Sequence, residues 1–102
     1  MSRRLEFLLK VTSTSADPFA WYGLAMEYRG LLRHDEAIST FEQLRARTPE
    51  YVPMYLMCGQ VLESLGRVEE ARSWFGSGLA VATAKGDAHA ASELQSALAN
   101  LS

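Results

Sequence analysis

Apolar residues recur at helical spacing along most of the chain. Between residues 18 and 30, one stripe contains Trp21, Leu24, Ala25 and Tyr28. Between residues 35 and 47, the same periodicity places Ala37, Ile38, Phe41 and Leu44 on one side. Spacings of three and four residues are typical of an amphipathic helix with one buried face. Because sustained apolar–polar alternation is absent and β-branched residues are sparse, the pattern predicts an all-α protein.

Local start and stop signals divide this pattern into separate helices. Asp17 and Pro18 have the character of an N-cap followed by proline at the first helical position. Pro49 ends a helix at Thr48, and glycine caps are expected at Gly66 and Gly86. The predicted helices are 5–11, 18–30, 35–47, 52–65, 68–85 and a last helix that Asp87 caps and that runs to about residue 100.

The last predicted helix has one apolar and one polar face. The apolar face contains Ala91, Leu94, Ala97, Leu98 and Leu101, and the polar face contains His89, Ser92, Glu93, Gln95, Ser96 and Asn100. A terminal helix of a repeat array needs a polar outer face, because an apolar one would allow further stacking. We therefore interpret this helix as a closing helix.

The sequence repeats itself with a period of about 34 residues, which indicates an array of small supersecondary units. A shift by this period aligns Phe7 with Phe41 and Phe75, and Ala37 with Ala71. The matches fall on apolar or small positions, as a shared packing scheme requires. They divide the chain into half a repeat (1–16), two full repeats (17–50 and 51–84) and a closing helix (85–102). The starting methionine and the capped last helix led us to expect a complete protein.

This pattern resembles the tetratricopeptide repeat signature. The first copy matches it closely, with Trp21, Leu24, Ala25, Tyr28, Ala37, Phe41 and Pro49. The second copy follows it at Tyr55, Cys58, Gly59, Leu62, Ala71 and Phe75, but Thr83 replaces the expected proline. The resemblance implies a right-handed superhelix of antiparallel helix pairs. The departure at Thr83 predicts that the fourth helix of the two repeats runs straight on.

By this resemblance, the first helix of each pair lines a concave groove that receives a partner protein or peptide. The side chains expected to face it are Phe19, Tyr22, Met26 and Arg29 in the first repeat and Leu56, Met57, Gln60 and Glu63 in the second. Some family members grip a C-terminal carboxylate with lysine, asparagine and arginine. Tyr22, Met26 and Met57 occupy those places here, so a hydrophobic or amphipathic segment fits better than an acidic tail.

Charge and composition exclude several other classes of protein. The chain of 102 residues has a formal net charge of −2, so it lacks the basic surplus of a nucleic-acid-binding protein. Its longest uncharged stretch, 52–62, is far too short to span a membrane. One cysteine cannot form an internal disulfide, which favours a reducing, cytoplasmic location.

The sequence offers no convincing catalytic, cofactor or metal site. His34, Asp35 and Glu36 could bind a metal, but two acidic residues at a helix start are explained by the helix dipole. Cys58 lies on a predicted buried stripe, away from a histidine base. Trp74 lies off the main stripe and could form a second, partly exposed contact surface. We therefore expect a protein that is not an enzyme and has no cofactor.

The favoured function is an adaptor that binds a partner in the groove, and two alternatives stay open. The closing helix could fold over Met26, Leu56 and Met57 and bury them as ordinary core. These side chains could also be covered by self-association into a homodimer, which would help a short repeat array to reach sufficient stability.

Overall fold

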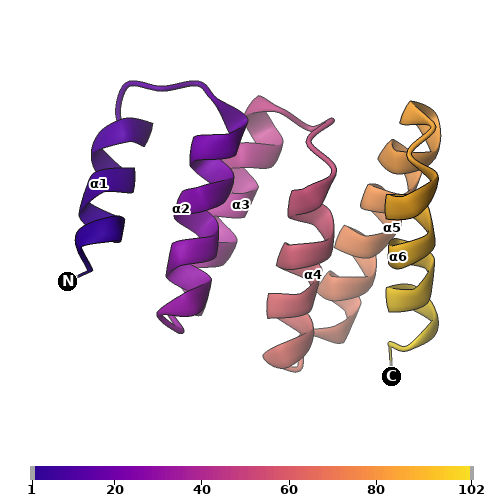
Figure 1. Cartoon of the computed structure of the whole chain (residues 1–102). Helices are drawn as coiled ribbons and strands as arrows, with labels where there is room; N and C mark the ends of the chain where they lie inside the picture. Colours follow the sequence, from indigo (N-terminus) through magenta and orange to yellow (C-terminus); the bar gives the residue numbers. More distant parts are fainter. Residues whose placement is uncertain (1, 102) are drawn as a thin grey trace. The chain divides into compact units, whose positions relative to one another are not determined.

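The computed structural model describes residues 2–101, which form six α-helices and contain no strand (Figure 1). The helices are α1 (Arg3–Thr12), α2 (Pro18–Gly30), α3 (His34–Arg47), α4 (Pro53–Ser64), α5 (Val68–Lys85) and α6 (Ala88–Ala99). Every predicted helix is present, and each boundary lies close to its predicted position. The prediction of an all-α chain is confirmed.

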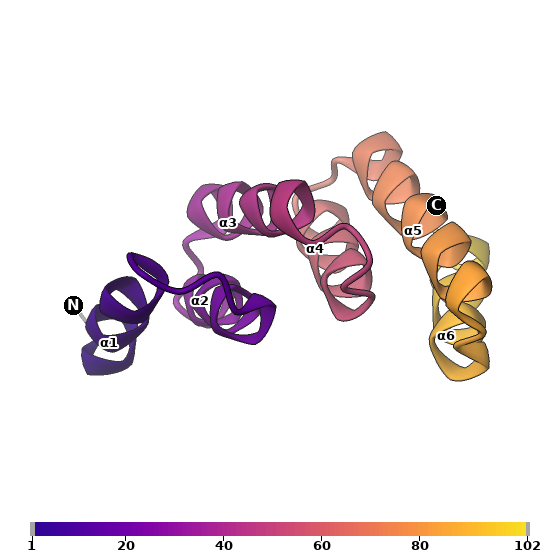
Figure 2. The same cartoon turned by 90° about the horizontal axis from the view of Figure 1, so that it is seen from above.

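Contacts within the chain define two compact units. The first ends at Tyr51 and contains α1, α2 and α3, and the second begins at Val52 and contains α4, α5 and α6. In each unit, consecutive helices run antiparallel beside one another (Figures 1 and 2). The division falls directly after the predicted boundary between the two full repeats.

The helix ends follow from local chemistry. The Asp17 carboxylate accepts a hydrogen bond from the backbone N–H of Phe19 at 2.9 Å, at the start of α2. Helix α5 continues past Thr83 to Lys85 and ends where Gly86 adopts a φ of +72°. The predicted effect of the missing proline is therefore confirmed.

The core of the second unit depends on glycine in contact with aromatic rings. Gly59 of α4 leaves room for the ring of Phe75, which is fully buried, because a Cβ atom on Gly59 would lie 2.3 Å from the ring. Gly78 of α5 meets Tyr55 in the same way, since its Cβ atom would lie 2.4 Å from that of Tyr55. These two contacts bring α4 and α5 closer together than side chains at both positions would allow.

The first unit uses alanine in the corresponding places. Ala25 and Ala37 are fully buried between α2 and α3, and Phe41 is also fully buried. Trp21 extends this core toward the loop before α2, where its indole N–H donates to the carbonyl of Ser15 at 2.9 Å. Large and small side chains thus recur in step in both units.

Two aromatic residues differ from their predicted positions. Phe7 is 64% exposed, although Phe41 and Phe75 are fully buried. The prediction that Phe7 occupies an equivalent packed layer is wrong, because α1 packs chiefly against α2 through its opposite face, with Leu5 and Leu8. Trp74 is only 6% exposed and its ring lies 5.8 Å from that of Tyr55, so it is a core residue and no second contact surface.

The turn between the two helices of each repeat shows the same correspondence between repeats. Gly66 adopts a φ of +76°, and Leu32, its equivalent one repeat earlier, adopts a φ of +60°. Left-handed backbone is accessible to glycine at little cost but is unfavourable for leucine. The chain keeps the turn geometry in both repeats even where the residue type disfavours it.

An ion pair follows each of these turns. The guanidinium of Arg33 donates two hydrogen bonds to Glu36, and that of Arg67 donates two to Glu70. These hydrogen bonds lower the pKa of both glutamates below the ordinary value. The two pairs are again related by a shift of one repeat, which supports the internal repeat from polar positions.

Candidate protein-binding surfaces

The first candidate surface lies on α2, and we call it the α2 surface. It consists of the four predicted residues Phe19, Tyr22, Met26 and Arg29. Phe19 is 70% exposed, and the other three side chains are half-buried. An apolar residue as exposed as Phe19, beside partly exposed Tyr22 and Met26, leaves this side of the first unit available for contact.

Tyr22 is held in place by two aromatic neighbours. Its ring lies 6.4 Å from that of Phe41, edge to face, and 5.5 Å from that of Tyr51. Burial raises the pKa of the Tyr22 hydroxyl, Tyr51 raises it further, and Arg29 partly opposes both. The ring is therefore fixed and its hydroxyl stays neutral, as suits contact with an apolar partner.

The second candidate surface lies on α4, and we call it the α4 surface. It consists of the predicted residues Leu56, Met57, Gln60 and Glu63. The first three are half-buried and Glu63 is exposed, whereas their neighbours Cys58 and Gly59 face the core and are buried. The residues that the sequence assigned to binding are thus not absorbed into the packing of α4 on α5.

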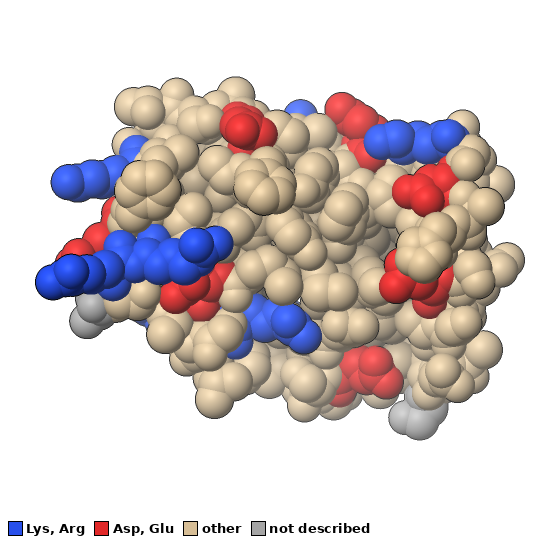
Figure 3. All heavy atoms as spheres, viewed as in Figure 1, with Lys and Arg blue, Asp and Glu red and all other residues tan. Residues whose placement is uncertain are grey.

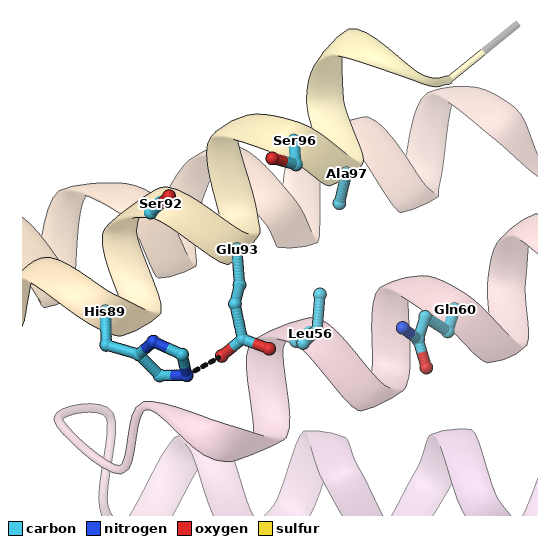
Figure 4. A pocket seen from close by; sticks show the side chains of 7 residues that line it. All are labelled: Leu56, Gln60, His89, Ser92, Glu93, Ser96 and Ala97. Atoms are coloured by element: carbon cyan, nitrogen blue, oxygen red, sulfur yellow. Dashed lines mark ion pairs between the residues drawn. The ribbon is translucent and has the colours of Figure 1, made fainter.

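A cleft of about 360 Å³ separates part of the α4 surface from α6. Leu56 and Gln60 form one wall, and the other wall comes from α6, as Figure 4 shows. The α6 residues that line the cleft are His89, Ser92, Glu93, Ser96 and Ala97. His89 Nε2 lies 3.3 Å from Glu93 Oε1, an ion pair when the imidazole is protonated. The closing helix borders Leu56 without fully burying it.

The α6 wall was not predicted as part of a site. Its side chains were assigned to the polar outer face, and the ones that line the cleft are exposed apart from Ala97. A shift by one repeat would have identified them, because His89, Ser92, Glu93 and Ser96 correspond to Tyr55, Cys58, Gly59 and Leu62. In α6 this side carries polar residues, since it has no following helix to pack against within the described chain.

The residues considered for other chemistry have structural surroundings. Cys58 is fully buried, and the carboxylate of Glu36 is bound by Arg33. Across residues 2–101, no three histidine, cysteine, aspartate or glutamate side chains gather in a way that could hold a metal ion. In the same part of the chain, no helix is both long enough and apolar enough to cross a membrane.

The architecture and the recurring glycine, alanine and aromatic contacts define an all-α helical-repeat protein. The tetratricopeptide repeat model matches residues 32–101, which is more than half of the chain. The chain therefore belongs to the tetratricopeptide repeat family, as its signature residues predicted.

Solved structures agree with this assignment. A tetratricopeptide repeat domain protein from Salinibacter ruber, solved by NMR, is 35% identical with a TM-score of 0.77, over 80% of this chain and 83% of that chain. Its crystal structure gives a TM-score of 0.75 at 35% identity, over 80% and 91% of the two chains. A protein from Bordetella parapertussis is 26% identical with a TM-score of 0.80, over 96% and 86%. None of the curated proteins compared with the chain matches it.

Proposed function

We propose that this tetratricopeptide repeat protein is an adaptor that binds a hydrophobic or amphipathic segment of a partner protein through its α2 and α4 surfaces. Membership of the family supports a scaffold for protein interaction in general. The observation that carries the finer proposal is the exposure of Phe19, which no internal packing contact requires. Tyr22, Met26 and Met57 extend the apolar character on the first helix of each repeat.

The chemistry of the two surfaces favours an apolar segment over a charged one. Aromatic rings and methionine side chains make adaptable contacts with varied apolar groups. Arg29 and Glu63 carry opposite charges at the ends of α2 and α4, so neither sign dominates. A partner helix with an apolar stripe and polar flanks would satisfy both features.

The test is quantitative capture of partners from the native host with matched variants. Phe19→Ala removes an exposed ring and should leave folding intact, while Tyr22→Ala/Met57→Ala removes contacts from both surfaces. Leu32→Gly is the control, because Leu32 is 73% exposed but lies in the turn after α2. Loss of the same partner from both surface variants, but not from the control, supports the proposal. Retention of every partner by variants whose thermal melts are normal would overturn it.

Self-association is the competing function, and the partly exposed apolar residues of both surfaces would also suit it. Light scattering after gel filtration distinguishes the two. A dimer that persists after the captured partner is added, and that Phe19→Ala disrupts, would favour self-association. A monomer that forms a complex with the partner would favour the adaptor.

A further inference from the structure

Helix α1 presents to solvent the face that is buried in every other helix of its type. A shift by one repeat relates Arg3, Glu6, Phe7 and Lys10 to Ala37, Thr40, Phe41 and Leu44 of α3, and a second shift relates them to Ala71, Trp74, Phe75 and Gly78 of α5. All of these α3 and α5 residues are buried, and all of the α1 residues are exposed. Together with Leu9, the α1 residues line an open surface hollow.

The cause is the absence of a first helix in front of α1. In the second unit, α4 covers the corresponding face of α5, with Gly59 against the ring of Phe75 and Tyr55 against Trp74. In the first unit, α2 covers the corresponding face of α3. Within residues 2–101, α1 is thus the second helix of a pair that has no first helix.

The opposite face of α1 is firmly attached to α2. Leu5 and Leu8 are buried there, and Arg4 forms an ion pair with Glu27 at 3.1 Å. The Ser2 hydroxyl also donates to Glu27 at 3.1 Å. Because α1 is held from this side, residues on its open face can be changed without loosening the unit.

We propose that the open face of α1, defined as Arg3, Glu6, Phe7 and Lys10, binds an amphipathic helix of another protein that takes the place of the missing first helix. The repeats of this chain specify its chemistry. It needs a small residue over the Phe7 ring, as Gly59 and Ala25 provide for Phe75 and Phe41, and larger apolar residues on either side.

Charge further defines this partner helix. Two cations, Arg3 and Lys10, and one acid, Glu6, replace the apolar and small residues found at the equivalent positions of α3 and α5. Lysine and arginine side chains gather over and beside α1, at the left of Figure 3. The helix that fits therefore carries a surplus of carboxylates flanking its apolar stripe.

A second copy of this chain does not meet these requirements. Its α2 and α4 already cover α3 and α5. Its α6 corresponds to a first helix but carries Glu93 at the position of Gly59, where a small residue is needed. The proposal concerns a surface separate from the α2 and α4 surfaces, and it can fail or succeed independently of them.

The test uses a stapled peptide with the sequence of residues 17–30 and Arg29→Glu, so that acids outnumber bases. A hydrocarbon staple joins positions 19 and 23, away from Ala25, because a peptide this short is not helical by itself. Its fluorescently labelled form is titrated with the full chain, and binding is followed by anisotropy. The matched control peptide carries Ala25→Leu, which fills the small position.

We expect saturable binding that Phe7→Ala weakens about tenfold or more, as loss of a central aromatic contact does. Arg3→Glu/Lys10→Glu should weaken it as well, whereas Phe19→Ala should have no effect. The control peptide should bind at least several-fold more weakly. The proposal is overturned if no saturable binding occurs, if Phe7→Ala has no effect, or if both peptides bind equally. A dimer of the chain that Phe7→Ala abolishes in sedimentation equilibrium would also overturn it, because a second copy would then occupy the face.

Discussion

Gly76 and Gly78 lie close together in α5, and their replacement by alanine should have opposite effects on stability. Alanine gains about 0.5–1 kcal/mol over glycine inside a helix, because glycine loses more backbone entropy on folding. At Gly76, an added Cβ atom meets nothing within 4 Å, so Gly76→Ala should show that gain in full.

At Gly78, the added Cβ atom would lie 2.4 Å from Tyr55 Cβ and 3.2 Å from Leu94 Cδ2. Relief of this overlap requires α4 and α5 to separate, and overpacking of a core typically costs about 1–3 kcal/mol. After the helix gain is subtracted, Gly78→Ala should be net destabilised by up to about 2 kcal/mol.

The assay is thermal and urea unfolding of both variants, followed by far-UV circular dichroism. A change of about 1 kcal/mol shifts the Tm of a domain of this size by about 4–8 °C, so the two variants should lie well apart on either side of the wild type. If Gly78→Ala were as stable as Gly76→Ala, the close approach of α4 and α5 would be wrong.

Three further predictions concern the repeated features of the chain. Phe75→Ala should cost about 3–5 kcal/mol in urea unfolding, because the ring is fully buried, and a melt that barely shifts would contradict this packing. Leu32→Gly should stabilise and Gly66→Ala destabilise the fold by about 1 kcal/mol each, since both positions have positive φ; equal Tm changes of the same sign would refute it. Glu70→Gln should lower the Tm slightly at neutral pH. Because Arg67 lowers the folded pKa of Glu70, that difference should vanish as the pH falls through the folded pKa, below the ordinary 4.5, and a difference independent of pH would contradict the ion pair.

The helix ends could be predicted from the sequence because their causes are local. Asp17 caps through its own side chain, and Gly86 ends α5 through its own backbone freedom. The repeat period then identified which helices pair, since the small and aromatic residues of a pair recur together. Neither inference depends on tertiary contacts between parts of the chain that are distant in sequence.

The errors have a common physical origin. Periodicity identified Phe7 as the equivalent of Phe41, but a phenylalanine is buried only if a helix lies in front of it. Trp74 shares the inward face of α5 with Phe75, which the main apolar stripe alone did not indicate. The cleft beside Leu56 depends on where α6 packs, a tertiary contact that no local pattern encodes.

The turn at Leu32 could have been found earlier. A shift by one repeat places Leu32 on Gly66, and a glycine expected to have positive φ implies the same backbone at its equivalent. The residue type concealed this correspondence, because leucine rarely adopts left-handed backbone.

The central claim is that a partner segment contacts the first helix of each repeat, and site-specific photocrosslinking in the native host tests it most directly. Benzoylphenylalanine is placed at Tyr22 or at Met57, and at Arg72 on the exposed side of α5 as the control. The account predicts that one partner protein crosslinks from both Tyr22 and Met57 and not from Arg72. Crosslinks that join only copies of this chain, or that form equally from Arg72, would contradict it.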